Sequence, residues 1–299
     1  MEETTSLGKA LAILTLGVAA MSSASVLIRL CPAPATTVAV YRVALGALLV
    51  LAAGFASGQR PAFRSDFPGF AVPWIAASGL FLAAHFATWI SSLDFTSVAS
   101  SVVLVQTSPV FVALLSKPVL HERVKPLQWV GIGLALLGTL VIAGADLSGG
   151  PEPLKGDLLA LLGALAGAGY WICGRRVRKH LDTVTYASLT YAAAALALLL
   201  FAAGTHTPVV GFSWRTYALL LAIAIFPQGL GHTSFNWSLK HLSATSVSVF
   251  ALGEPVGATL LAYLILHEGV PLGRALGAVL VLAGVVLVFR AEGGSGTAG

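Results

Sequence analysis

The chain has 299 residues, of which 57% are hydrophobic and only 10% are charged, and its mean hydropathy is +0.89. A soluble domain carries about a quarter charged residues, so this composition excludes a soluble globular protein and indicates a membrane protein. The net charge of +5 does not indicate a nucleic-acid partner, because the basic residues lie in short loops between apolar segments.

Ten apolar segments follow one another along the chain, each near the length of about 20 residues that a spanning helix requires. The first is too long for the apolar core of a signal peptide and lacks a small-residue cleavage site, so we expect a span. The connections are short and rich in turn-forming residues, which predicts a single all-α membrane domain. The expected spans are Gly8–Ile28, Ala35–Ala56, Pro68–Ser91, Ser97–Ser116, Leu127–Ala145, Gly156–Gly174, Val184–Gly204, Trp214–Asn236, Ser243–Ile265 and Leu272–Phe289.

Lysine and arginine are distributed unevenly between the two sides of these spans. With the N-terminus in the cytoplasm, twelve of the 17 basic residues fall at inner loops and ends, Arg60 and Arg64 among them, four fall outside, and Arg42 lies inside a span. Cytoplasmic loops of membrane proteins carry such an excess. We therefore expect a multi-pass protein of the cell inner (plasma) membrane with both termini cytoplasmic, which places Cys31 outside and Cys173 inside.

The second half of the chain repeats the first after a shift of 146 residues. Each repeat holds five spans, an odd number, so the second must be inverted relative to the first. Inverted repeats are typical of secondary transporters, whose solute site lies near the midplane between the halves. We expect repeats at 1–146 and 147–292, followed by a disordered tail at 293–299. The aligned residues include Arg29 with Arg175, Ser97 with Ser243, Pro109 with Pro255, and His121-Glu122 with His267-Glu268.

Short motifs accompany this repeat. Tyr41-Arg42-Val43-Ala44 lies early in the second span, and Glu254-Pro255 is followed twelve residues later by His267-Glu268. With the topology, they resemble the EamA type of the drug/metabolite transporter superfamily, and within it the YddG-type exporters of aromatic and other amino acids. The resemblance covers nearly the whole chain and implies a ten-helix metabolite exporter. One departure is that Ser108-Pro109 stands in the first repeat where the second has Glu254-Pro255.

Three polar residues are expected near the membrane midplane, where an unpaired polar group costs several kcal/mol. At 1.5 Å per residue, Arg42 lies roughly 10 Å and Gln106 roughly 14 Å below the outer edge, and Glu254 roughly 17 Å above the inner edge. Arg42 and Glu254 either form a purely structural ion pair or act on the solute or on protons. Gln106 either binds the solute or joins two helices.

Two further pairs of residues share helix faces at a spacing of four. His85 and Trp89 are expected to line an outer vestibule, and His232 and Asn236 an inner one, with Gln228 a turn earlier. Packing between helices is the alternative for each histidine.

Aromatic residues and prolines complete the candidate site. Tyr41 and Trp171 are expected to supply aromatic walls for an amphipathic solute. Pro109 and Pro255 interrupt backbone hydrogen bonding within their spans, which makes them either hinges or static kinks.

No motif indicates an enzyme. His121-Glu122 and His267-Glu268 lack a second histidine four residues on, so the zinc-protease pattern is absent. We therefore predict a secondary transporter that exports small amphipathic metabolites, amino acids and aromatic ones included, by alternating access around a midplane cavity. A channel or a non-transporting scaffold is the alternative, and an intramembrane enzyme is less favoured. The expected partners are a small-molecule substrate and the lipid bilayer, with no catalytic residue, metal, cofactor or nucleic acid and a monomeric chain.

Overall fold

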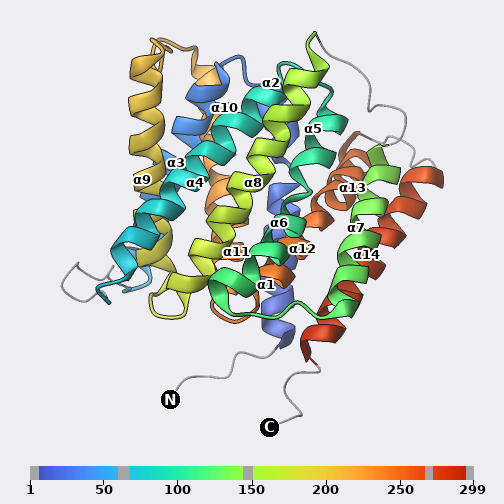
Figure 1. The fold of residues 1–299 in the computed structure, drawn as a ribbon. Coiled ribbons are helices and arrows are strands. Elements are labelled where there is room, and N and C mark those ends of the chain that lie inside the picture. The colour runs from blue at the N-terminus through green and yellow to red at the C-terminus, as the bar shows by residue number, and fades with distance from the viewer. Residues whose placement is uncertain (1–6, 60–67, 144–150, 267–271, 294–299) are drawn as a thin grey trace.

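The structure, a computed structural model, describes residues 7–59, 68–143, 151–266 and 272–293 (Figure 1). Within these ranges it is all-helical, and ten helical segments are long and apolar enough to cross a membrane, which confirms the predicted fold class and number of spans. The His267-Glu268 motif, Arg60, Arg64 and nearly all of the predicted tail lie outside the described residues.

Six of the ten spans are single helices, and four are built from shorter pieces. The single helices are α3 (Ala35–Ala56), α4 (Ala71–Ser92), α7 (Pro126–Ala143), α8 (Pro153–Arg178), α9 (Thr183–Gly204) and α14 (Leu272–Gly293). The composite spans are α1 with α2 (Leu7–Met21, Ala24–Leu30), α5 with α6 and a π-helical turn (Val98–Val105, Ser108–Leu115, Ser116–Leu120), α10 with a π-helix and α11 (Trp214–Ile223, Ala224–His232, Thr233–Ser238), and α12 with a 3-10 turn and α13 (Ala244–Phe250, Ala251–Gly253, Glu254–Leu266).

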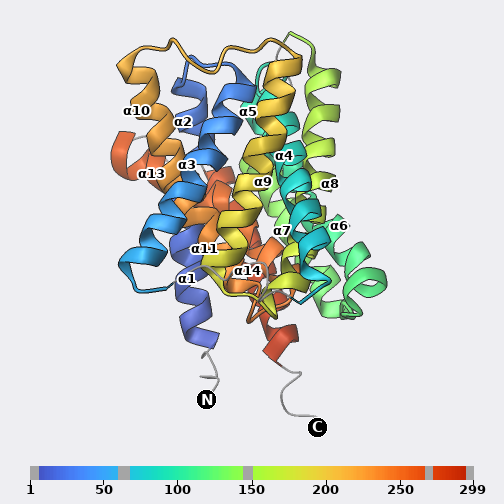
Figure 2. The same cartoon turned by 90° about the vertical axis from the view of Figure 1, so that its left-hand side faces the viewer.

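Helix α1 begins and α14 ends at the same end of the bundle (Figures 1 and 2). We call this end the terminal face and the other end the opposite face. Because every span reverses direction, the connections after α3, α8 and α11 also lie at the terminal face. The first residues of α5 and the last of α7 lie at the opposite face.

The fourth and ninth spans break at equivalent places. Helix α6 begins at Ser108 and α13 begins at Glu254, 146 residues later, and the second residue of each helix is a proline, Pro109 or Pro255. Proline has no backbone N–H and clashes with the carbonyl four residues before it, so a helix cannot pass through it undisturbed. The repeat in the sequence therefore appears as a repeat of broken helices.

An equivalent hydrogen bond occurs once in each repeat. Arg29 Nη1 donates to the carbonyl of Leu93 at 3.0 Å, and Arg175 Nη1 donates to the carbonyl of Leu239 at 2.7 Å. Both members of the second pair follow those of the first by 146 residues. Arg29 lies toward the opposite face and Arg175 toward the terminal face, as inverted repeats require.

Helices α7 and α14 pack against each other through glycines. A Cβ built on Gly131 would lie 2.7 Å from the carbonyl oxygen of Gly284, and one on Gly138 would lie 2.6 Å from that of Gly277. Small residues let two membrane helices approach closely and gain van der Waals contact. The 146-residue shift converts each glycine pair into the other, so this contact is symmetric between the repeats.

Candidate functional site

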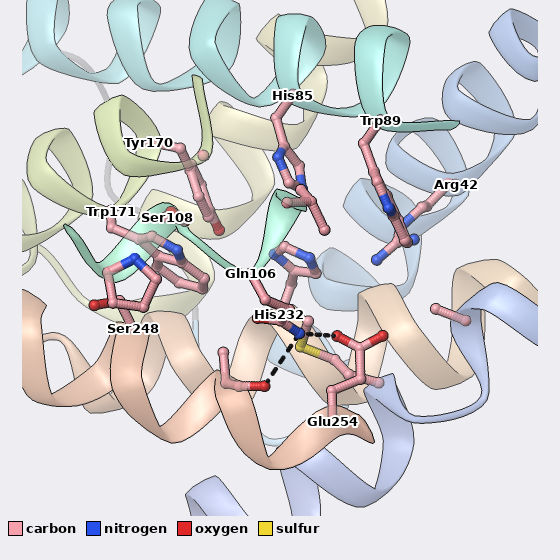
Figure 3. A pocket seen from close by; sticks show the side chains of 16 residues that line it. Arg42, His85, Trp89, Gln106, Ser108, Tyr170, Trp171, His232, Ser248 and Glu254 are labelled. Atoms are coloured by element: carbon pink, nitrogen blue, oxygen red, sulfur yellow. Dashed lines mark hydrogen bonds between the residues drawn. The ribbon is translucent and has the colours of Figure 1, made fainter. Parts of the chain in front are cut away.

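A cavity of about 50 Å³ lies where the broken helices meet, bordered by parts of seven spans (Figure 3). A water molecule needs about 10–15 Å³ of such volume, so the cavity admits a few waters in this conformation and no amino acid. The residues that line it are Met21, Ala24, Arg42, His85, Trp89, Val105, Gln106, Ser108, Pro109, Gly167, Tyr170, Trp171, His232, Ser248, Ala251 and Glu254.

Most of the residues selected from the sequence line this single space. His85 and Trp89 of α4 border it together with His232, so the two separate vestibules expected from the sequence are one cavity. The predicted residues that it brings together are Arg42, His85, Trp89, Gln106, Pro109, Trp171, His232 and Glu254.

Arg42 is only 1% exposed and keeps part of its bonding capacity free. Its Nε donates to Gln228 Oε1 at 3.0 Å, and its Cζ lies 4.1 Å from the ring centroid of Phe86, a cation–π contact. Its Nη1 has no hydrogen-bond partner among the described residues. A buried guanidinium with a free N–H is suited to donate a hydrogen bond to a carboxylate.

The local structure of the eighth span brings Gln228 to Arg42. Pro227 lies inside the π-helix Ala224–His232, and such wide turns occur often at functional sites. On α3, Gly46 leaves room for the side-chain methylene groups of Gln228, because a Cβ at position 46 would lie 2.6 Å from Gln228 Cγ. The same π-helix ends at His232, which lines the cavity.

Glu254 supplies the opposite charge at the start of α13. Its Oε2 accepts a hydrogen bond from Gln106 Nε2 at 3.1 Å, and the same Nε2 lies 3.4 Å from the carbonyl oxygen of Ala251 (Figure 3). Within the described parts of the chain, no ion pair joins Glu254 to Arg42. The ion pair considered from the sequence is therefore not formed, and the two charges border one cavity separately.

Aromatic rings form one wall of the cavity. Trp171 stacks on His232 with centroids 5.8 Å apart and an angle of 5°, and Tyr170 lies 5.8 Å from the same imidazole. Across the cavity, His85 stacks on Trp89 at 5.9 Å. The indole N–H of Trp89 and Nδ1 of His232 are buried and lack a partner among the described residues. The wall thus combines apolar surface with unused polar atoms.

Three of the predicted residues do not line the cavity, namely Tyr41, Pro255 and Asn236. Tyr41 donates to the carbonyl of Val209 at 2.9 Å near the opposite face, because a helix turns about 100° between Tyr41 and its neighbour Arg42. Pro255 lines a separate cleft next to the cavity.

Asn236 lies sealed between helices and does not line the cavity. Its Oδ1 accepts from Tyr170 Oη at 2.6 Å, and its Nδ2 donates to Tyr191 Oη at 3.0 Å. The side chain is fully buried, and buried polar groups require such partners. The hydroxyl of Tyr191 also lies 3.3 Å from Thr233 Oγ1.

Glu122 lies in the loop between the fourth span and α7, and its carboxylate lies close to two basic side chains. Its Oε1 lies 2.8 Å from Arg175 Nε and 3.3 Å from Lys179 Nζ, so it links the end of the fourth span to the end of the sixth.

Sequence reasoning missed several residues of the cavity. Ser108 is the repeat equivalent of Glu254 and has a buried hydroxyl without a described partner, so the repeat itself contained the signal. Tyr170 could have been found beside Trp171. Ser248 had no distinguishing signal in the sequence. The same is true of Phe86, which does not line the cavity but packs against Arg42.

Residues 8–144 and 154–290 each match the EamA-like transporter family. An uncharacterized transporter of Clostridium kluyveri is 25% identical over 206 residues, 67% of this chain and 66%, just under two thirds, of the length of that protein. The aromatic amino acid exporter YddG of Ancylobacter novellus is 27% identical over 224 residues, 73% of this chain and 74% of that protein.

A solved crystal structure has the same fold. It aligns with a TM-score of 0.78 over 98% of this chain and 100% of its own, at 21% sequence identity. The two family matches together cover more than half of the chain and coincide with its two halves. The chain therefore belongs to the EamA-like transporter family.

Proposed function

We propose that the protein is a secondary transporter that exports amino acids, aromatic ones included, by alternating access around the central cavity. The observation that carries this proposal is a pair of opposite charges, Arg42 and Glu254, that border one cavity without neutralising each other. A zwitterion buried without partners would lose several kcal/mol or more, so it requires such a pair.

The free atoms suggest how an amino acid would lie. Its carboxylate would bind the free Nη1 of Arg42 and the indole N–H of Trp89, both buried and without a described partner. Its ammonium group would bind Glu254 and the carbonyl of Ala251, the two acceptors that Gln106 now occupies. An aromatic side chain would then pack against the Trp171–His232 stack.

The small volume of the cavity supports a mechanism with more than one conformation. At about 50 Å³ the cavity must widen before an amino acid enters it. Breaks in the fourth and ninth spans at Pro109 and Pro255 provide equivalent positions in the two repeats about which half-helices could move. We propose that a single chain in a lipid bilayer carries out this cycle.

We further propose that the terminal face is cytoplasmic and that the protein lies in the inner membrane. The twelve-to-four distribution of basic residues supports this orientation. Export is the direction named for the YddG relative, and substrate would then load from the terminal face and leave at the opposite face.

Counterflow in proteoliposomes tests the function. Vesicles loaded with unlabelled phenylalanine should accumulate labelled phenylalanine transiently, and vesicles without internal phenylalanine or without protein should not. Vesicles with Arg42→Gln protein should accumulate it more slowly than vesicles with the wild-type protein. A channel would give equilibration without trans-stimulation, which would support the alternative function. Absence of counterflow across a panel of aromatic and aliphatic amino acids would reject the proposal.

A further inference from the structure

A second space lies beside the cavity, toward the opposite face. It is a cleft of about 370 Å³ between α5, α7 and α13. Ser97 and Ala143, at the ends of α5 and α7 near the opposite face, line its outer part, and Arg274 of α14 also borders it. Its volume exceeds that of the central cavity several times.

The cleft and the cavity are arranged end to end along shared helices. On the fourth span, Gln106 lines the cavity, and Val102, one turn nearer to the opposite face, lines the cleft. On the ninth span, Glu254 borders both spaces and Ala258, one turn further, lines the cleft alone. Both spans thus pass from one space into the other at the level of Glu254.

The pocket at the terminal face shares no described lining residue with the cavity. It has a volume of about 260 Å³ and lies beside Glu122 and Arg175. The 2.8 Å ion pair between these two residues ties the ends of the fourth and sixth spans together. Among the described residues, the central cavity therefore shares a lining residue with the cleft toward the opposite face and none with the pocket at the terminal face.

A side-chain hydrogen bond between Gln106 and Glu254 lies at the boundary between the two spaces. Gln106 lies at the break between α5 and α6, and Glu254 begins α13, so their 3.1 Å hydrogen bond joins the two broken spans (Figure 3). An ammonium group that takes Glu254 as its partner competes directly with this bond. Binding of a cation in the cavity would therefore weaken the link that separates the cavity from the cleft.

We propose that the cleft is the exit route of the transported solute and that the Gln106–Glu254 hydrogen bond is its gate. The proposal rests on the proposed function for the identity of the solute, whereas the route itself follows from the two adjoining spaces. The ammonium group of the solute opens the gate by displacing Gln106 from Glu254, so that only a solute able to pair with Glu254 is released efficiently.

Thiol accessibility tests the route without reference to any solute. In a Cys31→Ala, Cys173→Ala background, Ser248→Cys places one thiol in the cavity. A membrane-impermeant methanethiosulfonate added at the opposite face should modify it at least ten times faster when Gln106→Leu removes the gate. Gln128→Leu is the matched control, because Gln128 is also buried but bonds the backbone of Lys125 at the terminal face.

A second variant blocks the cleft itself. Ala258→Trp should slow modification of Ser248→Cys at least tenfold, with or without Gln106. Leu260→Trp, on the same helix but 54% exposed on the outside of the bundle, should not. Folding of each variant is checked by monodisperse elution in detergent.

The proposed route would be overturned if neither Gln106→Leu nor Ala258→Trp changed the rate at which the thiol of Ser248→Cys is modified. Faster modification from the terminal face than from the opposite face would also overturn it. Faster modification in Gln106→Leu together with protection by Ala258→Trp would support it. Failure of amino-acid counterflow with this modification pattern intact would reject the proposed substrate class and leave the route standing.

Discussion

Arg42 and Glu254 border one buried cavity, yet each is held by a neutral amide rather than by the other. Gln228 accepts from Arg42 at 3.0 Å, and Gln106 donates to Glu254 at 3.1 Å. An amide orients a charged group but leaves its charge uncompensated, whereas a direct ion pair would consume both charges. The arrangement therefore keeps a positive and a negative group available to a third molecule.

Trp171 is predicted to favour aromatic substrates. Its ring stacks on His232 at the cavity wall, and an aromatic contact contributes about 0.5–1.5 kcal/mol beyond the apolar area that it buries. Trp171→Leu should therefore weaken binding of phenylalanine by about 2- to 12-fold more than binding of alanine. Competition for bound radiolabelled substrate measures both affinities. Equal losses for the two amino acids would mean that Trp171 does not contact the side chain of the substrate.

Asn236 is predicted to stabilise the fold rather than to select the solute. Asn236→Leu would leave the buried hydroxyls of Tyr170 and Tyr191 without this partner, at a cost of about 1–3 kcal/mol. The melting temperature in detergent should fall by several degrees, with relative substrate affinities unchanged. Ser234→Ala serves as the control, since that hydroxyl donates to the carbonyl of Leu230 within the same span. Altered selectivity at unchanged melting temperature would instead assign Asn236 to the binding site.

The glycine contact between α7 and α14 is predicted to be sensitive to added volume. Gly131→Val would force its Cβ against the carbonyl of Gly284, and overpacking of this kind costs about 1–3 kcal/mol or more. Gly133 lies on the same helix with no heavy atom within 4 Å of a built Cβ, so Gly133→Val should be tolerated. Thermal unfolding of the two variants in the same detergent should therefore differ clearly. Equal melting temperatures would show that α7 and α14 do not pack as described.

The thiol of Cys31 is expected to react slowly with a membrane-impermeant thiol reagent, even though we propose that Cys31 lies near the outer face. It is 7% exposed, and burial raises the pKa of its thiol, so the reactive thiolate is scarce at neutral pH. In a cysteine-free background, Val210→Cys, 70% exposed, should label in intact cells, and exposed Ser57→Cys only after permeabilisation. The reverse pattern would invert the proposed topology.

The positions of the spans were predictable from the sequence because lipid forces the backbone into continuous hydrogen-bonded helices of a set length. Arg42 and Glu254 were predictable for a related reason, since charged groups at membrane depth are rare and costly. The 146-residue repeat also predicted that the breaks at Pro109 and Pro255 would be equivalent.

The rotation of each helix about its own axis, which decides the side chains that face the cavity, was not predictable. Tyr41 and Tyr170 are both tyrosines next to a cavity residue, but only Tyr170 faces the cavity, and nothing in either sequence neighbourhood distinguishes them. His232 and Asn236 share a helix face at a spacing of four, yet only His232 lines the cavity, because Tyr170 and Tyr191 enclose Asn236 between helices. Such details depend on packing against helices that are distant in the chain.

One cavity is proposed to bind both charged groups of an amino acid, the carboxylate through Arg42 and the ammonium group through Glu254. The most direct test is competition in phenylalanine counterflow by phenethylamine, which lacks the carboxylate, and by 3-phenylpropionate, which lacks the ammonium group. Each lost charge-assisted bond is worth about 1.5–3 kcal/mol, so each analogue should compete about 10- to 150-fold more weakly than phenylalanine. In Arg42→Gln, phenethylamine should compete as well as phenylalanine does, while 3-phenylpropionate should remain the weaker competitor. In Glu254→Gln, 3-phenylpropionate should compete as well as phenylalanine does, while phenethylamine should remain weaker. Analogues that compete with the wild-type protein as well as phenylalanine does would contradict the account.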